Sequence, residues 1–85
     1  MKNYQAFQVK YFGATNTRGS RVKITDMRFN KSIFIPFNYS SNNIADMAEE
    51  YLKKQGYILA GRALTDKIDI ILAEPINNLF KPLKK

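Results

Sequence analysis

The chain has 85 residues and a net charge of +7, from 14 Lys and Arg against 7 Asp and Glu, and it contains neither cysteine nor histidine. This length predicts one small domain, and the missing residue types exclude disulfides, thiolate nucleophiles, the usual general base and the commonest zinc ligand. We therefore expect a protein that is not an enzyme and has no metal site and no cofactor.

The first expected element is a strand over residues 4–12, where apolar and polar side chains alternate. A loop follows from Gly13 to Ser20, because this stretch is rich in turn-forming and hydroxyl-bearing residues. The inward face of the strand would carry Phe7, Val9 and Tyr11.

Residues 21–29 predict a second strand, although their apolar phase changes after Ile24. We expect a β-bulge near Thr25–Asp26, because one extra residue there would return Met27 and Phe29 to the core.

A tight turn at Asn30-Lys31 leads to a third expected strand over residues 32–39. Pro36 has no backbone N–H to donate and therefore suits an edge strand or a bulge. The inward side chains of this strand are expected to be Ile33, Ile35, Phe37 and Tyr39.

The best-defined element is a helix that begins near residue 44. Its apolar residues recur at i, i+3, i+4, i+7 and i+8 and form a single stripe. Asn42 or Asn43 is placed to cap its start, and Gly56 lies where the C-terminal cap needs a positive φ. The stripe consists of Ile44, Met47, Ala48, Tyr51 and Leu52.

Two further strands are expected over residues 57–64 and 67–73, joined by a hairpin turn at Thr65-Asp66. The first of them is apolar on both faces. The second places three large aliphatic side chains together on one face: Ile68, Ile70 and Leu72.

Residues 1–75 are expected to form the domain, and residues 76–85 a basic C-terminal tail. The tail either straps across the domain's own core or docks on a partner, and we favour the strap. No run approaches 18 apolar residues, and the N-terminus lacks the apolar segment of a secretory signal. We therefore expect a soluble, cytoplasmic protein with no membrane partner.

The element order β-β-β-α-β-β predicts an α+β fold, in which an antiparallel curved sheet has one helix packed on one face. A single helix leaves the other face to solvent, a second subunit or a ligand. The alternation assigns to this open face Gln8, Lys10, Arg21, Lys23, Thr25 and Phe34.

Positive charge is concentrated in the first half of the chain. Residues 1–45 contain seven basic residues and one acid, whereas residues 46–85 contain seven basic residues and six acids. The loop and the second strand combine backbone amides, hydroxyls and guanidinium groups, which are the donors that phosphate oxygens prefer. We predict a nucleic-acid site formed by Lys10, Thr15, Asn16, Thr17, Arg18, Ser20, Arg21, Lys23, Arg28 and Phe34. The alternative for this stretch is a solvated hairpin loop with ordinary surface charges.

Phe34 belongs to this site because it is the one mid-strand ring that alternation places outward, where a base can stack. Tyr4 and Phe12 lie at strand ends, where the phase is less well defined. The acids of the helix form i,i+4 pairs with lysines, which explains them without any catalytic role.

The segment from Lys10 to Ile24, KYFGATNTRGSRVKI, resembles one that recurs in small proteins of phages and mobile elements. The resemblance extends through Ile35–Ser40 and the helix, and covers residues 8–58. It implies an accessory role in phage DNA metabolism, and it assigns no activity and no site residue.

We expect sequence-independent binding of single-stranded DNA or RNA by a self-associating protein, because no helix presents basic residues to a major groove. The alternative is a phage-encoded inhibitor whose basic face meets a host defence protein, of anti-CRISPR or anti-restriction type. A purely structural subunit is the third possibility.

Overall fold

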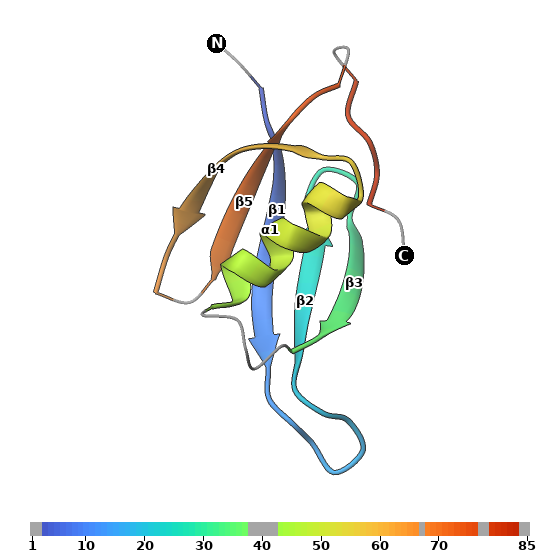
Figure 1. Cartoon of the computed structure of the whole chain (residues 1–85), viewed down its shortest axis with the longest axis vertical. Coiled ribbons are helices and arrows are strands. Elements are labelled where there is room, and N and C mark those ends of the chain that lie inside the picture. The colour runs from blue at the N-terminus through green and yellow to red at the C-terminus, as the bar shows by residue number, and fades with distance from the viewer. Residues whose placement is uncertain (1–2, 38–42, 67, 77–78, 84–85) are drawn as a thin grey trace.

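The protein is built on a sheet of five antiparallel strands in the order β3-β2-β1-β5-β4 (Figure 1). The computed structural model describes residues 3–37, 43–66, 68–76 and 79–83. The expected α+β fold is confirmed, with one helix between the third and fourth strands. The elements are β1 (Gln5–Phe12), β2 (Arg21–Asp26), β3 (Lys31–Pro36), α1 (Ile44–Lys54), β4 (Ile58–Leu64) and β5 (Asp69–Glu74).

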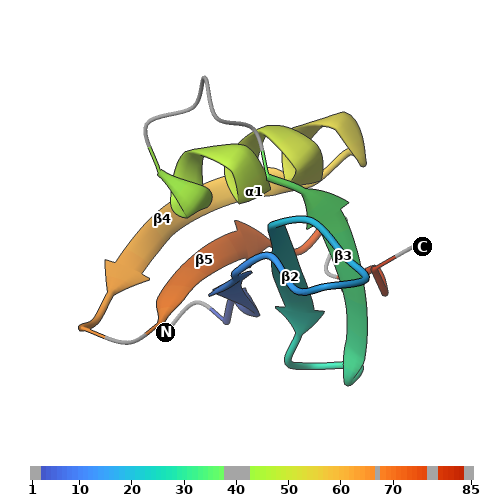
Figure 2. The same cartoon turned by 90° about the horizontal axis from the view of Figure 1, so that it is seen from below.

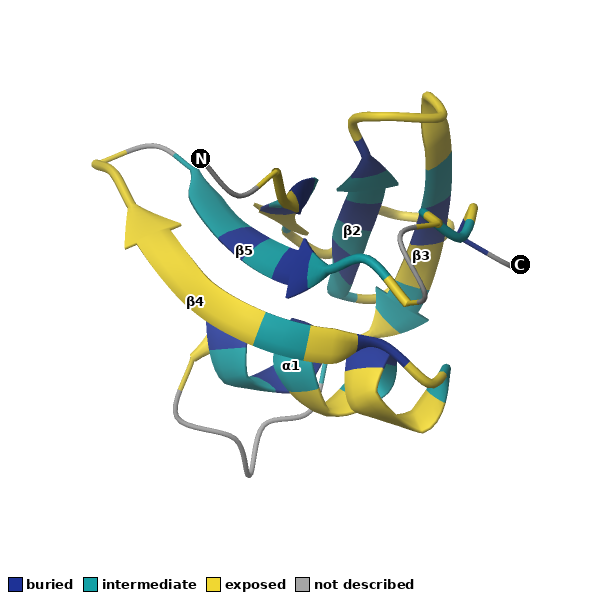
Figure 3. Ribbon diagram, turned by 90° about the horizontal axis from the view of Figure 1, so that it is seen from above, coloured by how far each residue is buried: buried dark blue, intermediate teal, exposed yellow. Residues whose placement is uncertain are grey.

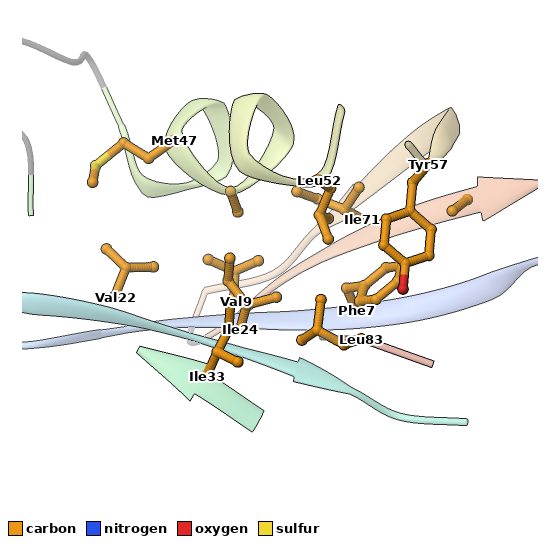
Figure 4. Close-up of a cluster of buried hydrophobic side chains, with 12 residues drawn as sticks. Phe7, Val9, Val22, Ile24, Ile33, Met47, Leu52, Tyr57, Ile71 and Leu83 are labelled. Atoms are coloured by element: carbon orange, nitrogen blue, oxygen red, sulfur yellow. The ribbon is translucent and has the colours of Figure 1, made fainter. Parts of the chain in front are cut away.

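Helix α1 covers one face of the curved sheet (Figure 2). Its apolar stripe buries Met47 and Leu52, which point from the helix toward the strands in Figure 4. Full burial of each large aliphatic or aromatic side chain contributes about 1.5–3 kcal/mol, so this layer of contacts holds the helix on the sheet. The core side chains of the strands include Phe7, Val9, Val22, Ile24, Ile33, Ile71 and Ala73.

Both ends of α1 agree with the sequence prediction. Asn43 is the N-cap, and its Oδ1 accepts a hydrogen bond from the backbone N–H of Asp46 at 2.9 Å. Gly56 follows the helix with φ at 96°, a conformation that a side chain would strain.

The prediction for the end of the second strand is wrong. β2 stops at Asp26, the pairing with β1 is continuous, and there is no bulge near Thr25–Asp26. Met27 and Phe29 are exposed in a turn rather than buried. The physical reason is that the Asp26 side chain points inward, where its Oδ1 accepts hydrogen bonds from the backbone N–H groups of Arg28 and Phe29 at 3.1 and 3.2 Å.

The buried Asp26 carboxylate also fixes the C-terminal segment. Its Oδ2 accepts hydrogen bonds from Gln5 Nε2 at 2.9 Å and from the backbone N–H of Leu83 at 3.1 Å. Gln5 Nε2 and the Tyr57 hydroxyl each donate to the carbonyl of Lys81 at 2.8 Å. Burial, with the nearby negative charge of Asp26 as a second cause, raises the pKa of Tyr57 to about 12, so its hydroxyl remains a donor. Because Leu83 is part of the core, the described part of the tail straps the domain.

β3 begins one residue before the predicted strand and ends at Pro36, earlier than the expected end at residue 39. It is an edge strand, as Pro36 indicates. The preceding turn spans residues 27–30, and Asn30 has φ at 54°. Tyr39 lies outside the described residues.

The face of β5 that packs on the core is not the face that carries Ile70 and Leu72. Ile71 and Ala73 are fully buried, so Ile70 and Leu72 lie on the face that α1 does not cover. The hairpin before it is closed by the backbone N–H of Thr65, which donates to the carbonyl of Ile68 at 3.0 Å.

Candidate nucleic-acid interface

The face of the sheet opposite α1 brings the outward residues of β1, β2 and β3 together. The strands pair in continuous register, and the inward residues of β1 and β2 alternate with these outward ones. This arrangement places on one face all six residues that alternation assigns to it: Gln8, Lys10, Arg21, Lys23, Thr25 and Phe34.

Two lysines on this face occupy directly paired positions. Lys10 on β1 is the register partner of Lys23 on β2, which in turn is paired with Phe34 on β3. Like charges at directly opposed positions destabilise a sheet. The ammonium of Lys23 lies 5.9 Å from the centre of the Phe34 ring, which offsets part of that cost.

Arg21 packs beside two aromatic rings. Its guanidinium carbon lies 5.4 Å from the centre of the Phe12 ring and 5.1 Å from that of Phe34. The two rings meet edge to face, with centroids 5.8 Å apart. Guanidinium atoms Nε and Nη1 are covered and have no hydrogen-bond partner among the described residues. The rings thus stabilise the cation without neutralising it.

We call this set the basic platform: Lys10, Phe12, Arg21, Lys23 and Phe34. Phe34 is 47% exposed, and its ring supplies a flat apolar surface beside the cations. The sequence prediction omitted Phe12 because it ends its strand. Continuing the alternation from Lys10 by two residues would have placed Phe12 on the open face.

The loop between β1 and β2 extends beyond the strand ends (Figure 1). Within it, the backbone N–H of Thr15 donates to the carbonyl of Arg18 at 2.7 Å, and Thr15 Oγ1 accepts from the N–H of Arg18 at 3.1 Å. Asn16 and Thr17 form the exposed tip of this turn. The loop residues of the predicted site therefore lie at the same end of the sheet as Arg21.

The base of the loop is fixed by Tyr11. Its hydroxyl donates to Ser20 Oγ at 3.0 Å, and its ring packs against Phe37 with centroids 5.1 Å apart. Tyr11 lies on the same strand face as Phe7 and Val9, as expected, because it is paired with the buried Val22, but its side chain is exposed rather than part of the core. The reason is that its ring lies at the sheet end, where α1 no longer covers it.

Arg28 does not belong to this cluster. It lies in the turn after β2, at the opposite end of the strand from the loop. Its guanidinium carbon is 4.1 Å from the centre of the Phe80 ring and 5.9 Å from that of Phe29. Arg28 packs on the C-terminal segment, and the structure separates it from the other residues of the predicted site.

The acids of α1 are matched by cations of the second half of the chain. Arg62 on β4 contacts Asp46 and Glu49 at 2.5 Å each, and Lys53 lies 3.1 Å from Glu49. The hydrogen bond from Arg62, followed by that from Lys53, lowers the pKa of Glu49. Within the described part of the chain, no ion pair involves a cation of the platform or the loop: Lys10, Arg18, Arg21 or Lys23.

One acid borders the basic platform. Lys10 shares a shallow hollow with Thr65, Asp66 and Ile68 of the β4–β5 hairpin. Across residues 3–37, 43–66, 68–76 and 79–83, no group of three or more Asp or Glu side chains is placed to hold a metal ion.

The helix that the structure describes has 11 residues and is too short and too polar to cross a membrane. Comparisons with protein-family models, curated proteins and solved structures found no match to this chain. The resemblance of Lys10–Ile24 to phage and mobile-element proteins therefore stays a prediction.

Proposed function

We propose that the protein binds single-stranded nucleic acid on the basic platform, without sequence preference. The observation that carries this proposal is Arg21, which packs beside two rings on an open face and has no ion-pair partner among the described residues. Single-strand binders combine cations that follow the phosphates with rings on which bases stack. The platform supplies both components within three neighbouring strands.

A single strand fits this surface better than a duplex. Reading a duplex in its major groove calls for a basic helix or ribbon that enters the groove. The basic residues in the last turn of α1 are Lys53 and Lys54, and both are paired with acids of the same helix. An unstacked base, by contrast, can lie against the half-exposed ring of Phe34 while its phosphates meet Lys10 and Lys23.

The loop adds a second contact to the platform in this proposal. Its turn directs exposed backbone and side-chain donors of Asn16, Thr17 and Arg18 beyond the end of the sheet. A strand that crosses Phe34 and continues past Arg21 meets these donors next. We place this activity in the cytoplasm and assign it to binding rather than catalysis.

The proposal is tested by fluorescence anisotropy with labelled single-stranded DNA, single-stranded RNA and duplex DNA across a range of salt concentrations. The double variant Lys10→Gln/Lys23→Gln should reduce the slope of log K against log salt by roughly 1.4, at about 0.7 for each single-strand phosphate contact. The matched control is Lys53→Gln/Lys54→Gln, which removes the same charge from α1. It should leave the slope unchanged.

Two results would contradict the proposal. One is an absence of binding at low salt for every oligonucleotide. The other is an equal loss of slope in both double variants, which would show that net charge alone drives association. Recovery of a host protein by the wild-type chain and not by Lys10→Gln/Lys23→Gln, together with the first result, would favour the inhibitor alternative.

A further inference from the structure

The two edges of the sheet are protected to different degrees. At one edge, β3 carries Lys31 at its start and Pro36 at its end, two residue types that discourage pairing with another strand. At the other edge, β4 contains no proline and no lysine. Within the described residues no strand lies beyond β4, so its outer backbone donors and acceptors face no partner strand.

β4 is apolar and exposed along almost its whole length (Figure 3). Ile58 is 53% exposed and Leu64 is 63% exposed, both high values for large aliphatic side chains in a strand. The pairing with β5 is irregular between Leu59 and Gly61. From Gly61 to Leu64 the strand is regular, and this segment offers a template for another strand.

The single charged residue of β4 does not protect its edge. Arg62 Nη2 contacts Asp46 and Glu49 of α1 at 2.5 Å, so its charge is neutralised within the molecule. The strands that carry the basic platform, β1 to β3, are separated from β4 by β5. The strands that carry most of the unpaired positive charge therefore lie away from this edge.

We propose that β4 pairs with β4 of a second copy of this chain and forms a symmetric dimer. A two-fold axis makes the two strands antiparallel, which is the mode of every strand pair in this sheet. Ala63 and Leu64 of both copies then lie along the seam, while Arg62 of each copy stays paired with Asp46 and Glu49 of its own α1. The result is one continuous sheet with a basic platform on each outer flank.

The test is the oligomeric state of the full chain without nucleic acid, so its outcome is independent of the proposed function. Sedimentation velocity at about 100 μM detects even a dimer of micromolar affinity. Wild type should sediment as a dimer, and Leu64→Lys should sediment as a monomer. The matched control is Leu79→Lys, which adds the same charge at a leucine that is 72% exposed and lies outside β4.

Circular dichroism should show all three proteins folded, because both leucines are exposed. As a second measurement, hydrogen exchange should show backbone amides of Gly61–Leu64 that become more protected as protein concentration rises. A monomeric wild type would overturn the proposal. So would a dimer that persists in Leu64→Lys, one that is lost equally in Leu79→Lys, or exchange in β4 that is independent of concentration.

Discussion

Cations on the helix side of this molecule and cations on its open face have different kinds of partner. On the helix side, Arg62 is held by the carboxylates of Asp46 and Glu49. On the open face, Arg21 lies against the ring of Phe34 and has no carboxylate partner among the described residues. A carboxylate neutralises a cation, whereas a ring stabilises it and leaves its charge available to an anion. The comparison separates cations that are paired with acids of the same molecule from cations that have no ion-pair partner among the described residues.

The comparison is tested most strongly by exchanging one arginine on each side for glutamine. Arg21→Gln should weaken binding to a single-stranded oligonucleotide by roughly 2–3 kcal/mol, about 30-fold to 150-fold, because a stacked cation and a phosphate contact are lost together. Arg62→Gln should leave the affinity unchanged. Anisotropy titrations at one fixed salt concentration measure both, and equal losses in the two variants would remove the distinction.

The contribution of the Phe34 ring to binding is tested separately from that of the neighbouring cations. Phe34→Leu keeps an apolar side chain but removes the aromatic face, and should reduce affinity by about 1–2 kcal/mol. Phe29→Leu, at an exposed ring beyond the far end of β2, is the matched control and should bind as wild type does. If Phe34→Leu binds as tightly as wild type, the contact with nucleic acid is electrostatic and base stacking has no part in it.

The smallest expected effect lies on the helix side and concerns the free energy of unfolding at low pH. Because Arg62 lowers the pKa of Glu49 in the folded state, the pair adds stability above the ordinary carboxyl pKa of 4.5, and this contribution is lost as the pH falls through the lowered value. Both side chains are partly exposed, so the contribution should stay below about 1 kcal/mol.

Urea unfolding at about pH 6 and about pH 3 measures this contribution as a difference in unfolding free energy. Arg62→Gln should lose stability at the higher pH and change little at the lower one. An equal change at both pH values would show that Arg62 acts through packing rather than through the charge of Glu49.

Local patterns in the sequence were sufficient for the helix and for the open face. The cap of α1 depends on Asn43, and its end on Gly56, both within a few residues of the helix itself. The alternation of β1 and β2 likewise placed Lys10, Arg21 and Lys23 on one surface. These features depend on neighbours in the chain, so the chain alone revealed them.

The features that the sequence did not reveal depend on distant partners. Asp26 can point inward at the end of β2 because Gln5 and Leu83, far away in the chain, donate hydrogen bonds to its buried carboxylate. Without those donors a buried aspartate is unfavourable, and local pattern alone therefore favours the bulge. Arg28 shares the charge of the other predicted site residues, but it follows the end of β2 opposite Arg21 and packs against Phe80 of the C-terminal segment.

The most direct test of the central claim is an NMR titration of the isotope-labelled chain with a short single-stranded oligonucleotide at low salt. The free cations of the open face should take up the strand, so the largest shifts are expected at Lys10, Phe12, Arg21, Lys23 and Phe34. Residues of α1 and Arg62 should stay unperturbed. Shifts centred on α1 or β4, or no shifts at a saturating concentration of oligonucleotide, would contradict the account.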